Sequence, residues 1–224
     1  MQKPIIAIDG YSSTGKSSIS KAIAERLGLI HVDTGALYRG VTYFALQNYV
    51  DKDNEIDLPR LLKNLDQINL KFQLENGSLS LYLNEKKIDD EIRDTRVSDH
   101  VSIIAKQKEI REFLLEMQKK FGEKGGVIMD GRDIATVVFP NADFKFFLTA
   151  TKEERAKRRF LELSRSNKNI KLEEVLENLI KRDRIDSERE FAPLKKAHDA
   201  IVIDNTDITK EETIEKICSI IINN

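Results

Sequence analysis

The sequence predicts an α/β protein in which a five-stranded parallel sheet is flanked by helices. Short apolar runs of strand length alternate with helical patterns along the 224 residues, as parallel strands joined by crossover helices require. A glycine-containing phosphate-binding pattern directly follows the first of these runs. Between the second and third runs, one segment instead shows the period-two alternation of antiparallel strands. We therefore expect one parallel sheet interrupted by a small antiparallel insertion.

The strands expected in the parallel sheet are five short runs rich in Ile, Val, Leu and Phe. They lie at 4–9, 29–32, 126–130, 144–148 and 200–204. Continuous apolarity, as in Val127-Ile128-Met129, suits a strand covered on both faces. Helices are expected from Ser17 onward, over about 98–121 as one long helix, and over about 210–222.

Residues 10–17 read Gly-Tyr-Ser-Ser-Thr-Gly-Lys-Ser, which is the G-x-x-x-x-G-K-[ST] phosphate loop in its strand–loop–helix setting. The helix N-terminus directs unpaired N–H groups and a positive dipole end at the loop. Lys16 can reach the β- and γ-phosphates of a nucleotide, and the Ser17 hydroxyl can bind Mg²⁺. The sequence therefore predicts a nucleoside triphosphate site formed by Gly10, Tyr11, Ser12, Ser13, Thr14, Gly15, Lys16, Ser17 and Ser18. The loop alone leaves open whether water, a protein or a small molecule accepts the γ-phosphoryl group.

The segment at about 66–92 departs from the strand–helix order. Leucine and phenylalanine alternate with polar residues on both sides of Asn76-Gly77, and Asn-Gly between alternating runs is a strong hairpin signal. We expect a small inserted subdomain within a single domain that spans 1–224.

Residues 151–191 are dominated by charge. Two solvated helices with i,i+4 ion pairs would explain much of this composition. However, Arg155, Arg158 and Arg159 share one helical face, and crowded guanidinium groups repel one another unless an anion collects them. A binding surface for phosphate is the alternative.

Composition limits the classes of function. The formal charge of −1 gives no general attraction to nucleic acid or anionic lipid. No apolar run reaches membrane-spanning length and no signal peptide is evident, so a cytoplasmic location is expected. Cys218 is the only cysteine and lies on an isoleucine stripe, which favours a packed core thiol. His31, His100 and His198 lack zinc-ligand spacing, and we interpret them as structural or surface residues.

Four further segments make the chain resemble the bacterial cytidylate kinases, a branch of the nucleoside monophosphate kinases. They are Asp33-Thr34-Gly35-Ala36-Leu37-Tyr38-Arg39, Gly131-Arg132-Asp133-Ile134-Ala135-Thr136-Val137-Val138-Phe139-Pro140, Arg182 with Asp186 and Arg189, and Ala192-Pro193-Leu194. The resemblance runs from about Ile5 to the last helix. It implies a P-loop NTPase fold, a monophosphate-binding insertion at about 66–92, and an arginine-rich helical lid at about 151–168. It also implies a monomer that uses ATP and Mg²⁺ to phosphorylate CMP or dCMP.

The same resemblance implies roles for individual residues. Phosphoryl transfer would depend on Lys16, Arg132, Arg155, Arg158 and Arg159. The acceptor would be bound by Thr34, Tyr38, Arg39, Ser102, Arg111, Arg132, Asp133, Arg182, Asp186 and Arg189. Mg²⁺ would be held by Ser17 and, through water, by Asp130.

The chemistry of cytosine is compatible with a carboxylate as base reader. Cytosine presents an N4 amino donor where uracil presents a carbonyl acceptor, so a carboxylate such as Asp133 favours cytosine. The nucleophile is an already ionised phosphate oxygen, so transfer needs positioning and charge neutralisation rather than a general base. An enzyme of this kind can therefore lack a catalytic His or Cys.

Structural alternatives remain for several of these residues. Asp133 and Arg132 would pair with each other in an ordinary turn, Tyr38 would pack as a core aromatic, and Arg182, Asp186 and Arg189 have the spacing of an ion-pair ladder. Ser13 and Ala135 stand where glycine is common in the family, and a serine restricts φ more than glycine does. Other acceptors, such as UMP, AMP, shikimate or dephospho-coenzyme A, remain open, as does a nucleotide-gated interaction module.

Overall fold

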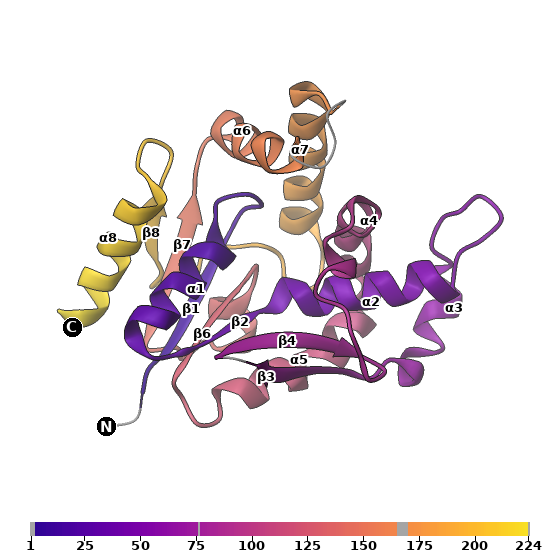
Figure 1. The fold of residues 1–224 in the computed structure, drawn as a ribbon, viewed down its shortest axis with the longest axis horizontal. Helices are drawn as coiled ribbons and strands as arrows, with labels where there is room; N and C mark the ends of the chain where they lie inside the picture. The colour runs from indigo at the N-terminus through magenta and orange to yellow at the C-terminus, as the bar shows by residue number, and fades with distance from the viewer. Residues whose placement is uncertain (1–2, 76, 165–169, 224) are drawn as a thin grey trace.

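The structure is a computed structural model that describes residues 3–75, 77–164 and 170–223. In these residues the chain forms a parallel sheet of five strands and a separate antiparallel sheet of three (Figure 1). The parallel strands are β1 (Ile5–Gly10), β2 (Ile30–Asp33), β6 (Val127–Gly131), β7 (Phe144–Thr149) and β8 (Ile201–Asp204). Each expected strand is confirmed to within about two residues at its ends.

The spatial order of the parallel sheet is β2-β6-β1-β7-β8, so the strand that precedes the phosphate loop lies at its centre. Ile8 pairs with Asp130 of β6 and with Phe146 of β7. Because the strands are parallel, their carboxyl ends meet at one edge. That edge brings together Gly10, Asp33 and Gly131, which are far apart in the sequence.

Helices cover both faces of this sheet. On one face α1 (Lys16–Leu27) and α8 (Lys210–Ile222) bury Ile19, Ile23 and Ile217 against the strands. Cys218 is also buried there, which confirms the expected core thiol. On the other face lie α5 (Lys108–Gly122), the short π-helix η3 (Ile134–Val138) and the segment that carries Leu194.

The antiparallel hairpin expected in the insertion is also confirmed. β3 (Leu70–Glu75) and β4 (Ser78–Leu83) form the expected antiparallel hairpin, and β5 (Lys86–Lys87) adds a short third strand. Asn76 of the predicted turn lies outside the described residues, and Gly77 has a φ of 80°. The hairpin packs on α2 (Thr34–Asn48) and α4 (Thr95–Lys106) in a separate hydrophobic cluster. The short helices α3 (Leu58–Leu62), η1 (Leu65–Gln67) and η2 (Glu91–Arg93) connect these elements.

The single long helix expected over about 98–121 is wrong. The chain instead forms α4 and α5, separated by Gln107, whose φ of −72° and ψ of 125° are extended. No glycine or proline marks this break. The break allows Arg111 of α5 to donate from Nη1 to the carbonyl oxygen of Ala105 in the last turn of α4, at 3.1 Å. A side-chain hydrogen bond thus joins the two helices at the point where the hydrophobic spacing predicted one continuous helix.

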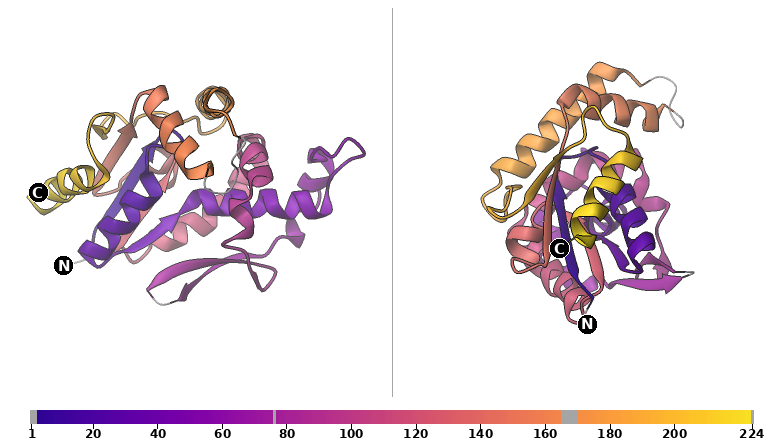
Figure 2. Two further views of the ribbon diagram at one scale, coloured as in Figure 1. Left: turned by 45° about the horizontal axis from the view of Figure 1, so that its top comes forward. Right: turned by 90° about the vertical axis from the view of Figure 1, so that its left-hand side faces the viewer.

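The charged segment forms α6 (Lys152–Leu163) and α7 (Leu172–Glu188), which pack against each other. Residues 165–169, in the expected lid, lie outside the described residues. Figures 1 and 2 show α6 and α7 on the opposite side of the molecule from the hairpin β3–β4. The active-site elements at the carboxyl edge of the sheet therefore lie between two peripheral parts of the chain.

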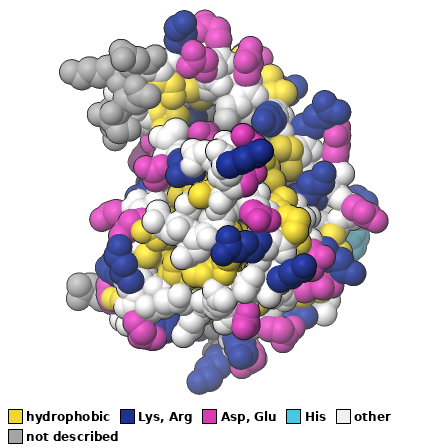
Figure 3. Space-filling view, turned by 90° about the vertical axis from the view of Figure 1, so that its right-hand side faces the viewer, with side chains coloured by type: hydrophobic (Ala, Val, Ile, Leu, Met, Phe, Trp, Pro, Cys, Tyr) yellow, Lys and Arg dark blue, Asp and Glu magenta, His cyan; other side chains and the backbone are white. Residues whose placement is uncertain are grey.

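The surface shows the balanced charge of the composition. On the face drawn in Figure 3, basic and acidic side chains alternate around small apolar areas. In the described ranges, no helix is both long and apolar enough to cross a membrane.

Candidate active site

The phosphate loop is shaped by the backbone of two residues. Gly10 has a φ of 150°, and a Cβ atom there would lie 2.1 Å from the carbonyl oxygen of Leu148, so only glycine fits. Ser13 adopts a left-handed φ of 61°, which costs a non-glycine residue about 1–2 kcal/mol. The replacement of a family glycine by Ser13 therefore leaves the loop in the conformation that glycine favours.

Lys16 lies at the base of the loop and is 6% exposed. Its Nζ donates to the carbonyl oxygen of Tyr11 at 2.5 Å. Burial, and next the positive charge of Arg132, hold the pKa of Lys16 well below its ordinary value. A bound anion at this position would oppose both effects, because a further negative charge favours the protonated form of Lys16.

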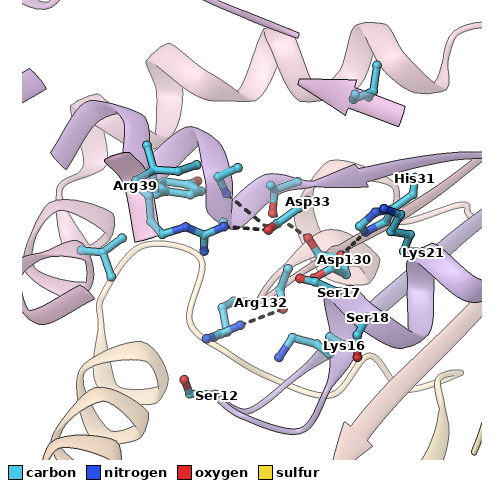
Figure 4. A pocket seen from close by; sticks show the side chains of 18 of the residues that line it. Ser12, Lys16, Ser17, Ser18, Lys21, His31, Asp33, Arg39, Asp130 and Arg132 are labelled. Atoms are coloured by element: carbon cyan, nitrogen blue, oxygen red, sulfur yellow. Dashed lines mark hydrogen bonds and ion pairs between the residues drawn. The ribbon is translucent and has the colours of Figure 1, made fainter. Parts of the chain in front are cut away.

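Ser17 and Asp130, which the sequence analysis expects to hold Mg²⁺, lie in direct contact. The Ser17 hydroxyl donates to Oδ2 of Asp130 at 2.8 Å, across from α1 to the end of β6. The other carboxylate oxygen, Oδ1, lies 2.6 Å from Nε2 of His31 on β2 (Figure 4). Burial lowers the pKa of His31, but the hydrogen bond to Asp130 together with the negative charges of Asp130 and Asp33 outweighs it, so the pKa is raised. The hydroxyl and carboxylate are oxygen donors of the kind that Mg²⁺ prefers, so these residues fit the ion.

These groups lie at one end of a large cleft of about 960 Å³. Its walls come from the phosphate loop, the ends of β2 and β6, the hairpin, and the helices α2, α4, α6 and α7. Most of the sequence-predicted residues line it: Ser12, Ser13, Gly15, Lys16, Ser17, Ser18, Thr34, Tyr38, Arg39, Ser102, Arg111, Asp130, Arg132, Asp133, Arg159, Arg182, Asp186 and Arg189. The tertiary fold thus collects residues from widely separated parts of the sequence around one cavity.

Asp133 also lines this cleft, where it is held by arginine. Its Oδ2 accepts from Nη2 of Arg111 at 2.5 Å, and its Oδ1 lies 3.6 Å from Nη2 of Arg189. The guanidinium of Arg111 also lies 5.1 Å from the ring centroid of Tyr38. Asp133 therefore does not form the pair with Arg132 that an ordinary turn would give. Tyr38 lines the cleft and is also a buried core aromatic.

A cluster of arginines, Arg132, Arg182 and Arg189, also lines the cleft. Nε of Arg132 donates to Asp186 at 2.8 Å. Burial alone would raise the pKa of Asp186, but Arg132 and then Arg189 hold it below its ordinary value. Asp186 also lies 3.7 Å from Nη1 of Arg189, so the ladder that the spacing allowed is formed in part, while the Arg132 pair joins Asp186 to a distant segment.

Arg182 is the least satisfied member of this cluster. Within the described part of the chain, its buried Nε has no hydrogen-bond partner, and neither has Nη2 of Arg189. Burial, followed by repulsion from Arg132, lowers the pKa of Arg182 to about 10, so it stays charged near neutral pH. Buried donors without acceptors, beside uncompensated positive charge, fit a phosphate group.

Arg39 and Thr34 belong to α2. Nη2 of Arg39 donates to Oδ2 of Asp33 at 2.7 Å, and Asp33 also caps the helix by accepting from the backbone of Ala36. Thr34 donates from its hydroxyl to the carbonyl oxygen of Asp130 at 2.8 Å. Figure 4 shows Arg39 and Asp33 across the cleft from Lys16. The expected phosphate ligand Arg39 is thus paired with a carboxylate that sequence reasoning did not select.

The three arginines of α6 do not converge on one point. Arg155 is 2% exposed and donates to Asp183 of α7 at 2.7 Å and to the carbonyl oxygen of Ser12 at 3.2 Å. Arg158 donates to Glu154 and to Asn205 instead. Of the three, among the described residues, Arg159 alone lines the main cleft, where it lies near Ser98. Gly10, Tyr11 and Thr14 are not among the residues that line the main cleft.

Sequence reasoning missed several residues that line the same cavity: Lys21, His31, Asp33 and Arg93. His31 was interpreted as structural or surface, and its contact with Asp130 is long-range, so no local pattern reveals it. Asp33 had a usable signal, because it ends a strand and directly precedes the Thr-Gly helix start.

The parallel sheet, with a phosphate loop after its central strand and a helix opening from that loop, defines a protein of the P-loop NTPase class. The family model for cytidylate kinase matches residues 6–223. The chain therefore belongs to the cytidylate kinase family, as its motifs indicated.

Curated relatives agree over the whole chain. It is 47% identical to the cytidylate kinase of Flavobacterium psychrophilum, with 100% of both chains covered. It is 48% identical to that of Clostridioides difficile, with 96% of both covered. Among solved structures, an uncharacterized protein from Eubacterium ventriosum has a TM-score of 0.54 at 14% identity, with 100% of both chains covered, which shows the fold alone.

Proposed function

We propose that this protein transfers the γ-phosphoryl group of ATP to CMP or dCMP and releases ADP with CDP or dCDP. The observation that carries the proposal is the shared cleft. The phosphate loop and the Asp133–Arg111 pair both line it. Donor and acceptor would thus be held together in one arginine-lined cavity.

On the donor side, the loop N–H groups and Lys16 would hold the ATP phosphates. Ser17 would bind Mg²⁺ directly and Asp130 through water, after their mutual hydrogen bond opens. When bound, Mg²⁺ supplies positive charge that neutralises the phosphates and fixes their geometry. Tyr11, Thr14 and Gly10 would act by shaping the loop, since Lys16 and Thr14 both donate to the carbonyl oxygen of Tyr11 and only glycine fits at position 10.

On the acceptor side, Asp133 would accept from the N4 amino group of cytosine, with Ser102 and Arg111 beside it. Arg39, Arg132 and Arg182 would bind the monophosphate, while Asp186 and Arg189 would hold the sugar and phosphate. Thr34 and Tyr38 would complete this pocket. The buried, unsatisfied donors of Arg182 and Arg189 support the assignment, because a phosphate would satisfy them.

Transfer would then need no general base. The attacking phosphate oxygen is already ionised, so Lys16, Arg132 and the lid arginines would neutralise the charge that develops on the transferring group. Arg159 is placed to do this directly, since it lines the cleft. Arg155 and Arg158 would act by holding α6 against the phosphate loop and Asn205. Residues 66–92 would serve as the monophosphate-binding insertion and 151–168 as the lid.

The test is ADP formation from ATP and Mg²⁺ with CMP, dCMP, UMP, AMP, GMP, shikimate or no acceptor. Turnover confined to CMP and dCMP supports the proposal. Turnover with another acceptor would contradict the role of Asp133 while leaving the donor site intact. Hydrolysis without any acceptor would instead favour a nucleotide-gated interaction module.

We further propose that the protein is a cytoplasmic monomer that binds neither nucleic acid nor membranes, in keeping with its formal charge of −1.

A further inference from the structure

Asp9 is a buried carboxylate that the proposed reaction does not use. It is 1% exposed and lies near the end of the central strand β1, one residue before the phosphate loop. Its two oxygens accept from the backbone N–H groups of Ile134 and Ala135, each at 2.8 Å. These residues begin η3, so Asp9 satisfies the N-terminus of a helix that belongs to a distant part of the chain.

Asp133 occupies the position where a capping residue normally acts. It is the N-cap residue of η3, and aspartate at that position ordinarily accepts from the N–H groups of its own helix. Here the Asp133 side chain makes no such bond. Its carboxylate instead lies against Arg111 and Arg189 in the cleft. Asp9 thus performs the capping that Asp133 would otherwise perform.

We propose that Asp9 is a positioning residue for acceptor recognition, because it caps η3 in place of Asp133 and leaves the Asp133 carboxylate for Arg111 and the base. The inference rests on the proposed function, in which Asp133 reads cytosine. Without Asp9, the unsatisfied N–H groups of Ile134 and Ala135 would compete with Arg111 and the acceptor for the nearest carboxylate. A buried N–H without an acceptor is costly enough to draw a neighbouring side chain into a new rotamer.

The backbone around Asp133 is too tightly packed to adjust instead. A Cβ atom on Gly131 would lie 2.7 Å from both the Thr34 hydroxyl and the side chain of Ile134. The turn between β6 and η3 is therefore fixed by packing. The Asp133 side chain can still change its direction, and Asp9 controls that direction by capping the N-terminus of η3.

The experiment measures the ratio of kcat/KM for CMP to that for UMP in the whole enzyme, together with KM for ATP. In Asp9→Ala we expect this ratio to fall about tenfold or more, while KM for ATP changes by less than about twofold. Asp9→Asn keeps one acceptor oxygen and should give an intermediate ratio. If Asp9→Ala does not fold, the comparison of Asp9→Asn with wild type carries the test on its own.

A double-mutant cycle separates positioning from a general structural effect. In an Asp133→Ala background, the loss of Asp9 should reduce the CMP/UMP ratio no further, because the group that it positions is absent. Asp143→Ala is the matched control. Asp143 accepts from the backbone N–H of Ile5 at 2.7 Å, at the opposite end of the same strand, and its loss should leave the ratio unchanged.

Two results would overturn the inference. One is an unchanged CMP/UMP ratio in both Asp9 variants, and the other is an equal loss for ATP and CMP, which would place the effect at Lys16. Neither result contradicts the proposed function as long as the wild-type enzyme selects CMP. If the wild-type enzyme does not select CMP, the proposed function itself fails.

Discussion

The Nε2 atom of His31 lies 2.6 Å from Oδ1 of Asp130, whose other oxygen accepts from the Ser17 hydroxyl. The histidine therefore orients the carboxylate that is proposed to face Mg²⁺. Partners of this kind around metal sites commonly affect metal affinity by about 10–100-fold.

We expect His31→Leu, which keeps the side-chain volume but removes the donor, to raise the Mg²⁺ concentration needed for half-maximal activity by about tenfold. His31→Gln retains an N–H donor and should restore most of the response. Calorimetric titration with ADP, with Mg²⁺ and with EDTA, checks the same effect on binding. Equal Mg²⁺ dependence in all three proteins would show that His31 only packs.

Lys16→Ala should reduce phosphoryl transfer by at least about 10²-fold, because it removes the charge closest to the proposed β- and γ-phosphates. Circular dichroism and thermal unfolding should show an intact fold. Lys216→Ala, on the exposed side of α8, is the control for loss of one surface charge. Near-normal turnover in Lys16→Ala would contradict the phosphate-loop assignment.

Asp133→Ala should lower kcat/KM for CMP by at least about tenfold and leave KM for ATP within about twofold of wild type. The physical reason is the loss of the acceptor for the cytosine amino group. Since Arg111 also loses its buried partner, Asp133→Asn is measured alongside as a variant of the same shape. An equal loss for CMP and ATP would refute the role of Asp133 as base reader.

The stability of the protein should depend on pH through Asp9. Burial raises the pKa of Asp9 from 3.8 to about 7, against the opposing hydrogen bonds from Ala135 and Ile134. The native state then holds this proton more tightly than the unfolded chain does. Between pH 3.8 and about 7, the Asp9 contribution to the free energy of unfolding therefore falls as pH rises.

Urea unfolding of wild type and Asp9→Asn across this pH range isolates the contribution. The difference in the free energy of unfolding, wild type minus Asp9→Asn, should decrease from low to high pH. The contributions of the other carboxylates are the same in both proteins and cancel in this difference. A difference that does not vary with pH would show that Asp9 titrates at its ordinary value.

Ser13→Gly should raise the free energy of unfolding by up to about 1 kcal/mol, because glycine adopts the φ of 61° without the left-handed penalty. Ser219→Gly within α8 is the matched control. It should lower the free energy of unfolding by about 0.5 kcal/mol, because glycine has a lower helix propensity than serine. Urea unfolding measures both changes. A loss of stability in Ser13→Gly would mean that the serine side chain stabilises the loop.

The sequence by itself determined the elements with strong local signals. The phosphate loop, the parallel strands and the hairpin each depend on neighbouring residues, through glycine spacing, continuous apolarity or period-two alternation. These patterns set where the nucleotide-binding loop begins and where the insertion lies. The family motifs added the residues that line the cleft.

Only the tertiary structure decided which side chains meet. The break at Gln107 is stabilised by Arg111 and carries no glycine or proline signal, so helical periodicity continued through it. The pairing of Asp133 with Arg111, and the capping of η3 by Asp9, join residues 22 and 125 or more positions apart. Such contacts arise because parallel strands bring their carboxyl ends to one edge, and the sequence pattern of each strand contains no information about its partners across that edge.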